Sequence, residues 1–151
     1  MTYETENKQE HDLSLKLFIV LTRAVESVRK QVEKDVRSHG LNLTEFAVLE
    51  LLFNKGEQPI QKIGSKVLLA SSSITYVVDK LEKKGYLTRK PCPNDRRITF
   101  AVITKSGKTL MEEIFPKHVE ALHNIMGGIT SEEKSILIEK LKQLGLYAES
   151  L

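Results

Sequence analysis

Hydroxyl and cationic side chains share the outer face of one predicted helix, residues 71–84. At about 100° per residue, its apolar side chains fall on the opposite face: Ile74, Val77, Val78 and Leu81. We expect Ser71 or Ser72 to cap its N-terminus and Gly85 to end it, because glycine readily adopts the left-handed backbone found after many helices. The outer-face and flanking side chains able to contact a ligand are Ser71, Ser72, Ser73, Thr75, Tyr76, Lys80 and Lys83.

Small hydroxyl groups near the N-terminus, followed by positive charge, suit a helix that enters the DNA major groove. Ser72, Ser73, Thr75 and Tyr76 would then contact base edges, while Lys80 and Lys83 would lie on phosphates. An ordinary amphipathic surface helix would show the same pattern, so the neighbouring segments must decide between the two interpretations.

The segment after the helix predicts a β-hairpin with a basic tip. Residues 86–90 and 96–103 favour strands, and the Pro-, Asn- and Asp-containing residues 91–95 favour a loop between them. The tip carries Asn94, Asp95, Arg96 and Arg97. We expect Asp95 to brace the hairpin by pairing with one arginine, and Arg96 or Arg97 to enter the narrow minor groove.

A shorter predicted helix, residues 60–66, precedes the outer-face helix, and its Lys62 and Lys66 can meet phosphates. Two short helices followed by a hairpin make a winged helix-turn-helix, in which the hairpin is the wing. The wing with Asp95-x-Arg97, Ile103-Thr104 opening a long helix, and Gly107 near the start of that helix resemble the MarR family of bacterial winged-helix regulators. The resemblance extends over about residues 13–146.

The resemblance implies a dimeric transcriptional regulator in which the first, fifth and sixth helices form the dimer interface. It also implies a small effector, often aromatic or phenolic, bound between the long helices and the winged region. Such a ligand would alter the spacing of the two DNA-reading helices. The resemblance does not identify the residues of this ligand site.

The predicted fold is mainly α with a small β-hairpin wing, in a single domain over residues 1–151. A winged helix-turn-helix region, 44–103, would be flanked by dimerisation helices at about 13–38 and 104–146. Thr44 is expected to start the second helix, and Pro116 to bend or break the fifth. Thr130 and Glu133 form a capping box for the last helix.

Positive charge is concentrated in the segment that contains the two short helices and the wing. Residues 55–105 carry eleven Lys and Arg against four Asp and Glu, a net of +7, whereas the whole chain carries +3. This distribution is typical of a face that binds a polyanion. A solvated basic face without a ligand is the alternative.

Catalytic, metal and membrane functions find no support in the sequence. It has no phosphate-binding glycine loop, no cofactor motif, no signal peptide and no apolar run long enough to cross a membrane. One cysteine excludes an intramolecular disulfide and fits a cytoplasmic protein. The four histidines are scattered, and we expect all of them to be solvated: His11, His39, His118 and His123.

Cys92 is a candidate redox-sensing residue, because it lies in the wing between two prolines, where modification would disturb DNA contact. Some MarR regulators sense oxidants through a cysteine in the N-terminal helix; this chain has none there, so that mechanism does not carry over. An incidental exposed thiol is the alternative interpretation.

The sequence therefore predicts a homodimeric regulator, most simply a repressor, that binds an inverted-repeat operator in double-stranded DNA. A small molecule, or oxidative or electrophile stress, would release it. The alternatives are an activator of the same fold and a winged-helix module that binds protein instead of DNA.

Overall fold

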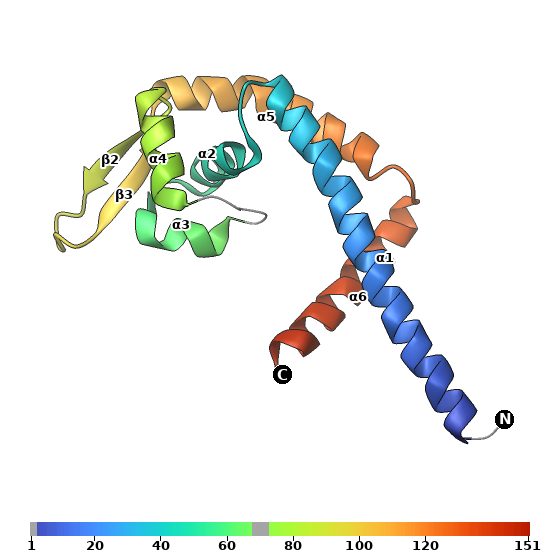
Figure 1. Cartoon of the computed structure of the whole chain (residues 1–151). Coiled ribbons are helices and arrows are strands. Elements are labelled where there is room, and N and C mark those ends of the chain that lie inside the picture. The colour runs from blue at the N-terminus through green and yellow to red at the C-terminus, as the bar shows by residue number, and fades with distance from the viewer. Residues whose placement is uncertain (1–2, 68–72) are drawn as a thin grey trace.

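The computed structural model describes residues 3–67 and 73–151 (Figure 1). The elements in chain order are α1 (Tyr3–Ser38), α2 (Leu43–Lys55), β1 (Gln58–Pro59), α3 (Ile60–Lys66), α4 (Ile74–Lys83), β2 (Leu87–Pro91), β3 (Thr99–Ile103), α5 (Lys105–Ile125) and α6 (Ser131–Glu149).

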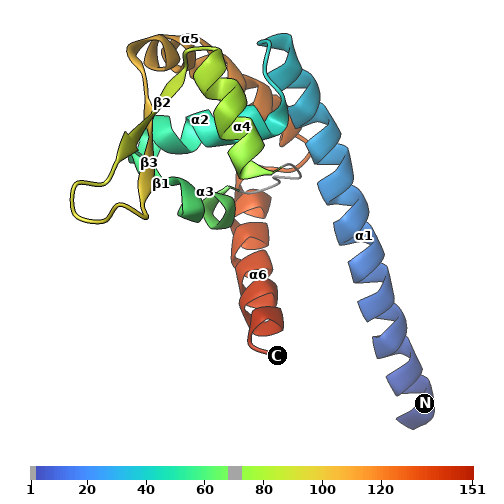
Figure 2. The same ribbon diagram turned by 60° about the vertical axis from the view of Figure 1, so that its left-hand side comes forward.

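Two parts differ in how they pack. The winged lobe, residues 41–67 and 73–104, holds α2, α3, α4 and the sheet around one core. The helical arm, which we define as residues 4–27 of α1 together with α6, has no buried residue. Figures 1 and 2 show both arm helices extending away from the lobe, with α5 joining lobe to arm.

The lobe core forms where apolar faces of α2, α3 and α4 meet the sheet and the first half of α5. On α4, Val77, Val78 and Leu81 are buried, which confirms the predicted inner face, and Ile74 packs beside them. Leu49 and Ile63 supply the corresponding faces of α2 and α3.

The sheet has three strands in the order β1-β3-β2, all antiparallel. Leu87 pairs with Ile103 and Pro91 with Thr99, so the predicted hairpin is confirmed. The third strand was not predicted: Gln58 pairs with Ala101 and Pro59 with Phe100. A two-residue strand that contains a proline has the composition of a turn, and only its pairing with β3 reveals it.

Several helix boundaries differ from the prediction. α1 begins at Tyr3 instead of residue 13, because its first turns are polar and show no apolar stripe. α2 begins at Leu43, since Asn42 and Glu45 form a capping box that the prediction missed. α5 continues unbroken through Pro116, so a break there is wrong. α6 runs to Glu149, beyond the expected end near 146.

The predicted start of α4, the helix expected at residues 71–84, is also corrected. α4 begins at Ile74 with Ser73 at its N-cap, and the Ser73 side chain makes no capping hydrogen bond. Ser71 and Ser72, expected to cap it, lie outside the described residues. At the other end, Gly85 has a φ of 82°, as expected of the residue that ends the helix.

Candidate nucleic-acid interface

The outer face of α4 presents the predicted contact residues to solvent. Ser73, Thr75 and Lys83 are exposed, Tyr76 is 63% exposed, and Lys80 is half-buried. These side chains point away from the core because the helix buries its opposite face against α2 and the sheet. The outer face of α4 is therefore open to a ligand.

The α3 lysines differ in their surroundings. Lys62 is exposed, whereas the Lys66 Nζ donates a hydrogen bond to Gln58 Oε1 at 2.6 Å. Gln61, also on α3, donates from Nε2 to the backbone oxygen of Arg97 at 3.0 Å. Gln61 therefore ties α3 to the wing, and within residues 3–67 and 73–151 the side chain of Lys66 has a hydrogen-bond partner whereas that of Lys62 has none.

The wing tip is held by one carboxylate. Asp95 accepts hydrogen bonds from the Arg97 backbone N at 3.0 Å, from Nε at 3.1 Å and from Nη2 at 3.2 Å. These bonds hold the pKa of Asp95 below its ordinary value. The expected brace is confirmed, and Arg97 is the arginine that forms it.

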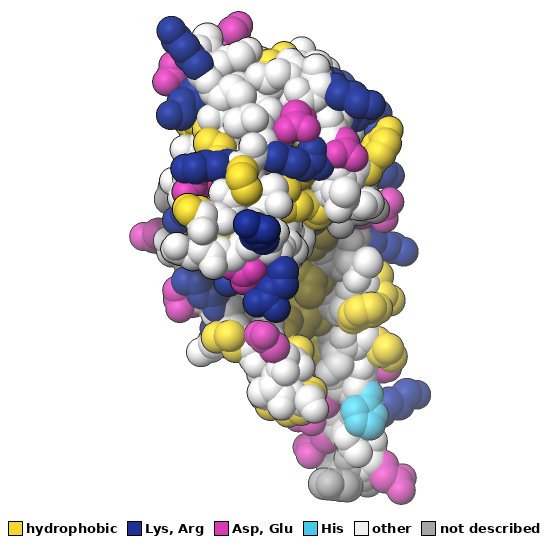
Figure 3. All heavy atoms as spheres, turned by 90° about the vertical axis from the view of Figure 1, so that its left-hand side faces the viewer, with side chains coloured by type: hydrophobic (Ala, Val, Ile, Leu, Met, Phe, Trp, Pro, Cys, Tyr) yellow, Lys and Arg dark blue, Asp and Glu magenta, His cyan; other side chains and the backbone are white. Residues whose placement is uncertain are grey.

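Both arginines of the tip nonetheless remain accessible. The Arg97 side chain is 91% exposed despite its pairing with Asp95, and Arg96 is exposed, with no ion pair to any described residue. Asn94 is exposed beside them. Figure 3 shows this side of the molecule, with Lys and Arg side chains spread over its upper and middle parts and hydrophobic side chains along the lower helix.

Two further cations of residues 55–105 form ion pairs with carboxylates of the same chain. Lys84 donates from Nζ to Glu45 Oε2 at 2.6 Å, and the Glu45 side chain is only 3% exposed. Arg89 pairs with both Asp79 and Glu82. The count of charges along the sequence therefore overstates the positive charge that the interface can offer to a polyanion.

Cys92 is half-buried and free, and its backbone N donates to the Ile98 oxygen at 3.0 Å. Within the described residues, no group of His, Cys, Asp and Glu could hold a metal ion. No described helix is long and apolar enough to cross a membrane.

A buried polar cluster at the junction of lobe and arm contradicts the expectation for the histidines. His118 of α5 is 6% exposed, and its Nδ1 lies 2.8 Å from Asp35 Oδ2 of α1. Its ring packs against Phe46 with centroids 4.5 Å apart. His39 is also largely covered, so neither is solvated; His11 and His123 are exposed, as expected. The sequence does contain one indication of this cluster. Asp35 follows Val28 and Val32 at helical spacing on α1, and a carboxylate on such an apolar face needs a partner.

A pocket adjoins this cluster between α1, α2, α5 and the end of α3. Its walls are mostly apolar, with Glu50, His118, Lys55 and Lys66 as the charged or titratable side chains. Burial raises the pKa of the Glu50 carboxyl, and the nearby His118 partly opposes that rise. No local pattern in the sequence indicates the residues of this pocket.

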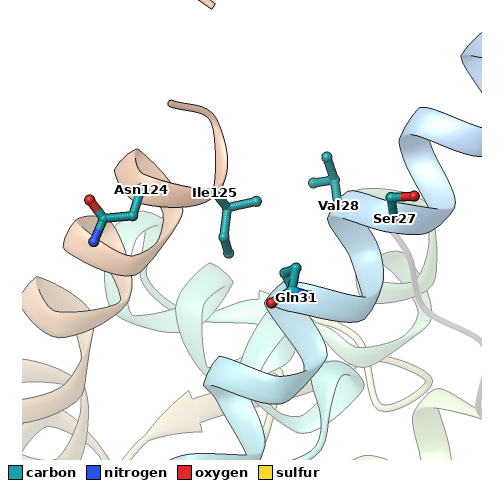
Figure 4. Close-up of a pocket in the computed structure, with 5 residues that line it drawn as sticks. All are labelled: Ser27, Val28, Gln31, Asn124 and Ile125. Atoms are coloured by element: carbon teal, nitrogen blue, oxygen red, sulfur yellow. The ribbon is translucent and has the colours of Figure 1, made fainter. Parts of the chain in front are cut away.

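A second pocket lies between α1 and the end of α5. Figure 4 shows Val28 and Ile125 facing one another across it, with Gln31 below them; the full lining is Ser27, Val28, Gln31, Asn124 and Ile125.

Comparison with known proteins places this geometry in a family. The MarR family model matches residues 41–99. The HTH-type transcriptional regulator MhqR of Bacillus subtilis (strain 168) is 54% identical over 136 residues, which is 90% of this chain and 94% of that protein.

Solved structures with lower identity share the fold. A MarR family transcriptional regulator from Streptomyces coelicolor, Sco3205, in complex with DNA, has a TM-score of 0.76 and 22% identity, covering 90% of this chain and 86% of that one. Bordetella bronchiseptica BpsR, whose DNA binding is regulated by 6-hydroxynicotinic acid, has a TM-score of 0.73 and 21% identity, covering 83% and 90%. By the identity and coverage of its B. subtilis relative, the chain belongs to the MarR family of DNA-binding transcriptional regulators, and it is not an enzyme.

Proposed function

We propose that the chain is a homodimeric repressor that binds an inverted-repeat operator and is released by a small molecule. The observation that carries this proposal is the exposed hydroxyl and basic face of α4 with the basic tip of the wing. The DNA complex of Sco3205 supports the same use of this fold.

Each subunit would place α4 in a major groove and the wing tip at the adjacent minor groove. Ser73, Thr75 and Tyr76, with Ser71 and Ser72, would contact base edges. Lys62, Lys66, Lys80 and Lys83 would lie on phosphates, and Arg96, Arg97 and Asn94 would approach the minor groove. Of the two wing arginines, Arg96 is the freer to enter the groove, because Arg97 is held by Asp95.

The helical arm supports a homodimer. Large apolar side chains are exposed along both arm helices: Leu13, Leu17, Phe18, Val20, Ile136, Leu137, Ile138, Leu141 and Leu144. Monomeric proteins seldom leave such a continuous apolar surface in water. A second copy would cover it and bring two α4 helices to one side of the DNA.

The pocket beside Glu50 and His118 is the effector site that we propose. It touches α1 and α5, which continue into the arm, and Lys66 and Val67 at the end of the helix before α4. A ligand there would contact both parts and could alter their relative orientation. BpsR, regulated by an aromatic acid, supports a small aromatic effector. Cys92, half-buried in the wing, is the alternative input, sensitive to oxidants or electrophiles.

The test is DNA binding by fluorescence anisotropy on the duplex upstream of the protein's own gene, at several salt concentrations. Log affinity should fall linearly with log salt, by about 0.9 per phosphate contacted, and footprints should show half-sites about 34–36 Å apart. A slope near zero would contradict DNA reading, and protection of a lone half-site by a monomer would contradict the dimer. Transcription from that promoter with and without the protein separates repressor from activator.

A protein-interaction module would behave differently. Neutralising Arg96 and Arg97 together would then leave DNA retention unchanged. In the repressor, the same double variant loses affinity for operator and scrambled duplex alike, because minor-groove contacts report width and charge more than base identity.

A further inference from the structure

Arg89 on β2 is a basic residue beside the reading helix that does not face solvent freely. Its Nη1 donates to Glu82 Oε1 at 2.6 Å, and its Nη2 donates to Asp79 Oδ1. Its backbone N donates to the other oxygen of Glu82 at 3.2 Å. One guanidinium thus joins the strand to two carboxylates of α4.

The spacing of the two carboxylates explains the arrangement. Asp79 and Glu82 are three residues apart on α4, so they lie one above the other on the same flank of the helix. A planar guanidinium can bond to both through different nitrogens, whereas an ammonium group acts as a single point charge. Both carboxylates raise the pKa of Arg89 above its ordinary value.

The next residue provides a contrast. Successive side chains of a strand point to opposite faces, so Lys90 points away from α4. Lys90 is exposed, whereas the Arg89 side chain is 29% exposed. A phosphate approaching Arg89 would meet the carboxylates of Asp79 and Glu82, which already occupy the guanidinium.

We propose that Arg89 is a positioning residue, which fixes α4 against the wing through Asp79 and Glu82 so that helix and hairpin dock on DNA as one rigid unit. Arg89 itself neutralises no phosphate. The proposal rests on the DNA-reading function proposed above, and it predicts that loss of a negative charge from the interface weakens binding.

Asp79→Asn is the decisive variant, because the proposal predicts weaker DNA binding where a simple charge effect predicts stronger binding. Near a polyanion, removing a carboxylate should strengthen binding if only charge matters. If Asp79 holds Arg89 and thereby α4, Asp79→Asn instead weakens operator binding by about tenfold, the loss expected from a misplaced base contact. Arg89→Lys keeps the charge and loses the bridge, so it should show a similar loss.

Salt dependence separates positioning from contact. Arg89→Ala should lower affinity while leaving the slope of log affinity against log salt unchanged. Lys83→Ala, the matched control at an exposed lysine, should reduce the slope by about 0.9. The exchanged pair Arg89→Asp with Asp79→Arg has the wild-type net charge and should recover most of the affinity lost by either single variant.

Each outcome decides the proposal. Tighter binding by Asp79→Asn, or a reduced slope in Arg89→Ala, would overturn it while leaving the DNA-reading function intact. Absence of DNA binding by the wild-type protein would instead overturn the function itself. Circular dichroism and the melting temperature identify variants that fail to fold; if Arg89→Ala is among them, Arg89→Lys and Asp79→Asn supply the answer.

Discussion

In the winged lobe Leu49, Ile63 and Leu81 are fully covered, whereas in the helical arm Phe18, Ile138 and Leu146 are more than half exposed. The lobe buries its apolar side chains against other elements of the same chain. The arm carries a comparable set of side chains and leaves them open. The lobe is therefore held by contacts within its own chain, including those that α1 and α5 make with its core, while the arm needs a second surface, which we propose is another copy.

The largest expected effect comes from a cavity in the lobe. Leu81→Ala should lower the free energy of unfolding by about 2–5 kcal/mol, because Leu81 is fully buried under α4 and the site cannot collapse freely. Denaturant unfolding at fixed protein concentration measures it. Tyr76→Ala on the outer face of α4 is the control and should stay within about 0.5 kcal/mol of wild type. A small effect of Leu81→Ala would contradict the assignment of the core.

A charge in the arm should break the proposed subunit contact and leave the lobe folded. Leu141→Asp should cost about 2–4 kcal/mol of association, because a carboxylate would be buried in an apolar interface. Sedimentation should show monomers, and operator affinity should fall accordingly. Gln143→Asp makes the same charge change about 200° further around α6 than Leu141. Ile136 is the one member of the proposed apolar interface set on that face, so this variant should weaken the dimer far less. A monomeric wild type, or equal effects of both variants, would refute the proposed interface.

Two glycines extend the comparison to backbone packing. A Cβ at Gly107 would overlap the carbonyl oxygen of Tyr86 and lie 2.7 Å from Ile103 Cγ1, where α5 starts against the wing. Gly107→Ala should therefore destabilise the protein by about 1–3 kcal/mol in thermal unfolding. Gly145 in α6 has open space around it, so Gly145→Ala should instead stabilise by up to about 1 kcal/mol. Reversal of these signs would contradict the close approach of α5.

The smallest expected effect concerns Glu50, at the junction of the two parts. Burial raises the pKa of the Glu50 carboxyl in the folded protein above its ordinary value of 4.5. The protonated carboxyl therefore contributes its full stability below pH 4.5, and this contribution is lost as the pH rises through the folded-state pKa. At pH 7 the Glu50→Gln variant should therefore melt a few degrees higher than wild type, and at about pH 4 the two should melt at the same temperature. The difference at pH 7 stays small because solvent screens this half-buried group. Melting temperatures across that range test it; a Glu50→Gln variant less stable at pH 7 would show that the carboxylate makes a favourable contact.

The sequence was most informative where a residue type has one structural use. Gly85 predicted the end of α4, Thr130 with Glu133 predicted the start of α6, and Asp95 predicted the brace of the wing. The three- and four-residue spacing of apolar residues along α4 predicted its buried face, because burial there follows the helical period.

Features that depend on distant contacts were missed. The pairing of His118 with Asp35 joins residues 83 positions apart, and Glu45 reaches Lys84 across 39. Nothing local in the sequence distinguishes Arg89, which pairs with two carboxylates, from Lys90, which is exposed. The first turns of α1 are not predicted by the sequence pattern, because they are helical without burying an apolar face.

α5 connects the lobe to the arm, so a rotation at one of its ends displaces the other end. Its first turn is capped by Thr104, which also bonds to Gly85 at the end of the reading helix, and His118 fixes its second half to α1. Twenty-one residues of helix span about 32 Å. A rotation of about 10° at the arm would move the far end by about 5 Å, more than the rise of one base pair, roughly 3.4 Å. Small angular changes beside the proposed effector pocket would thus shift the register of α4 on DNA.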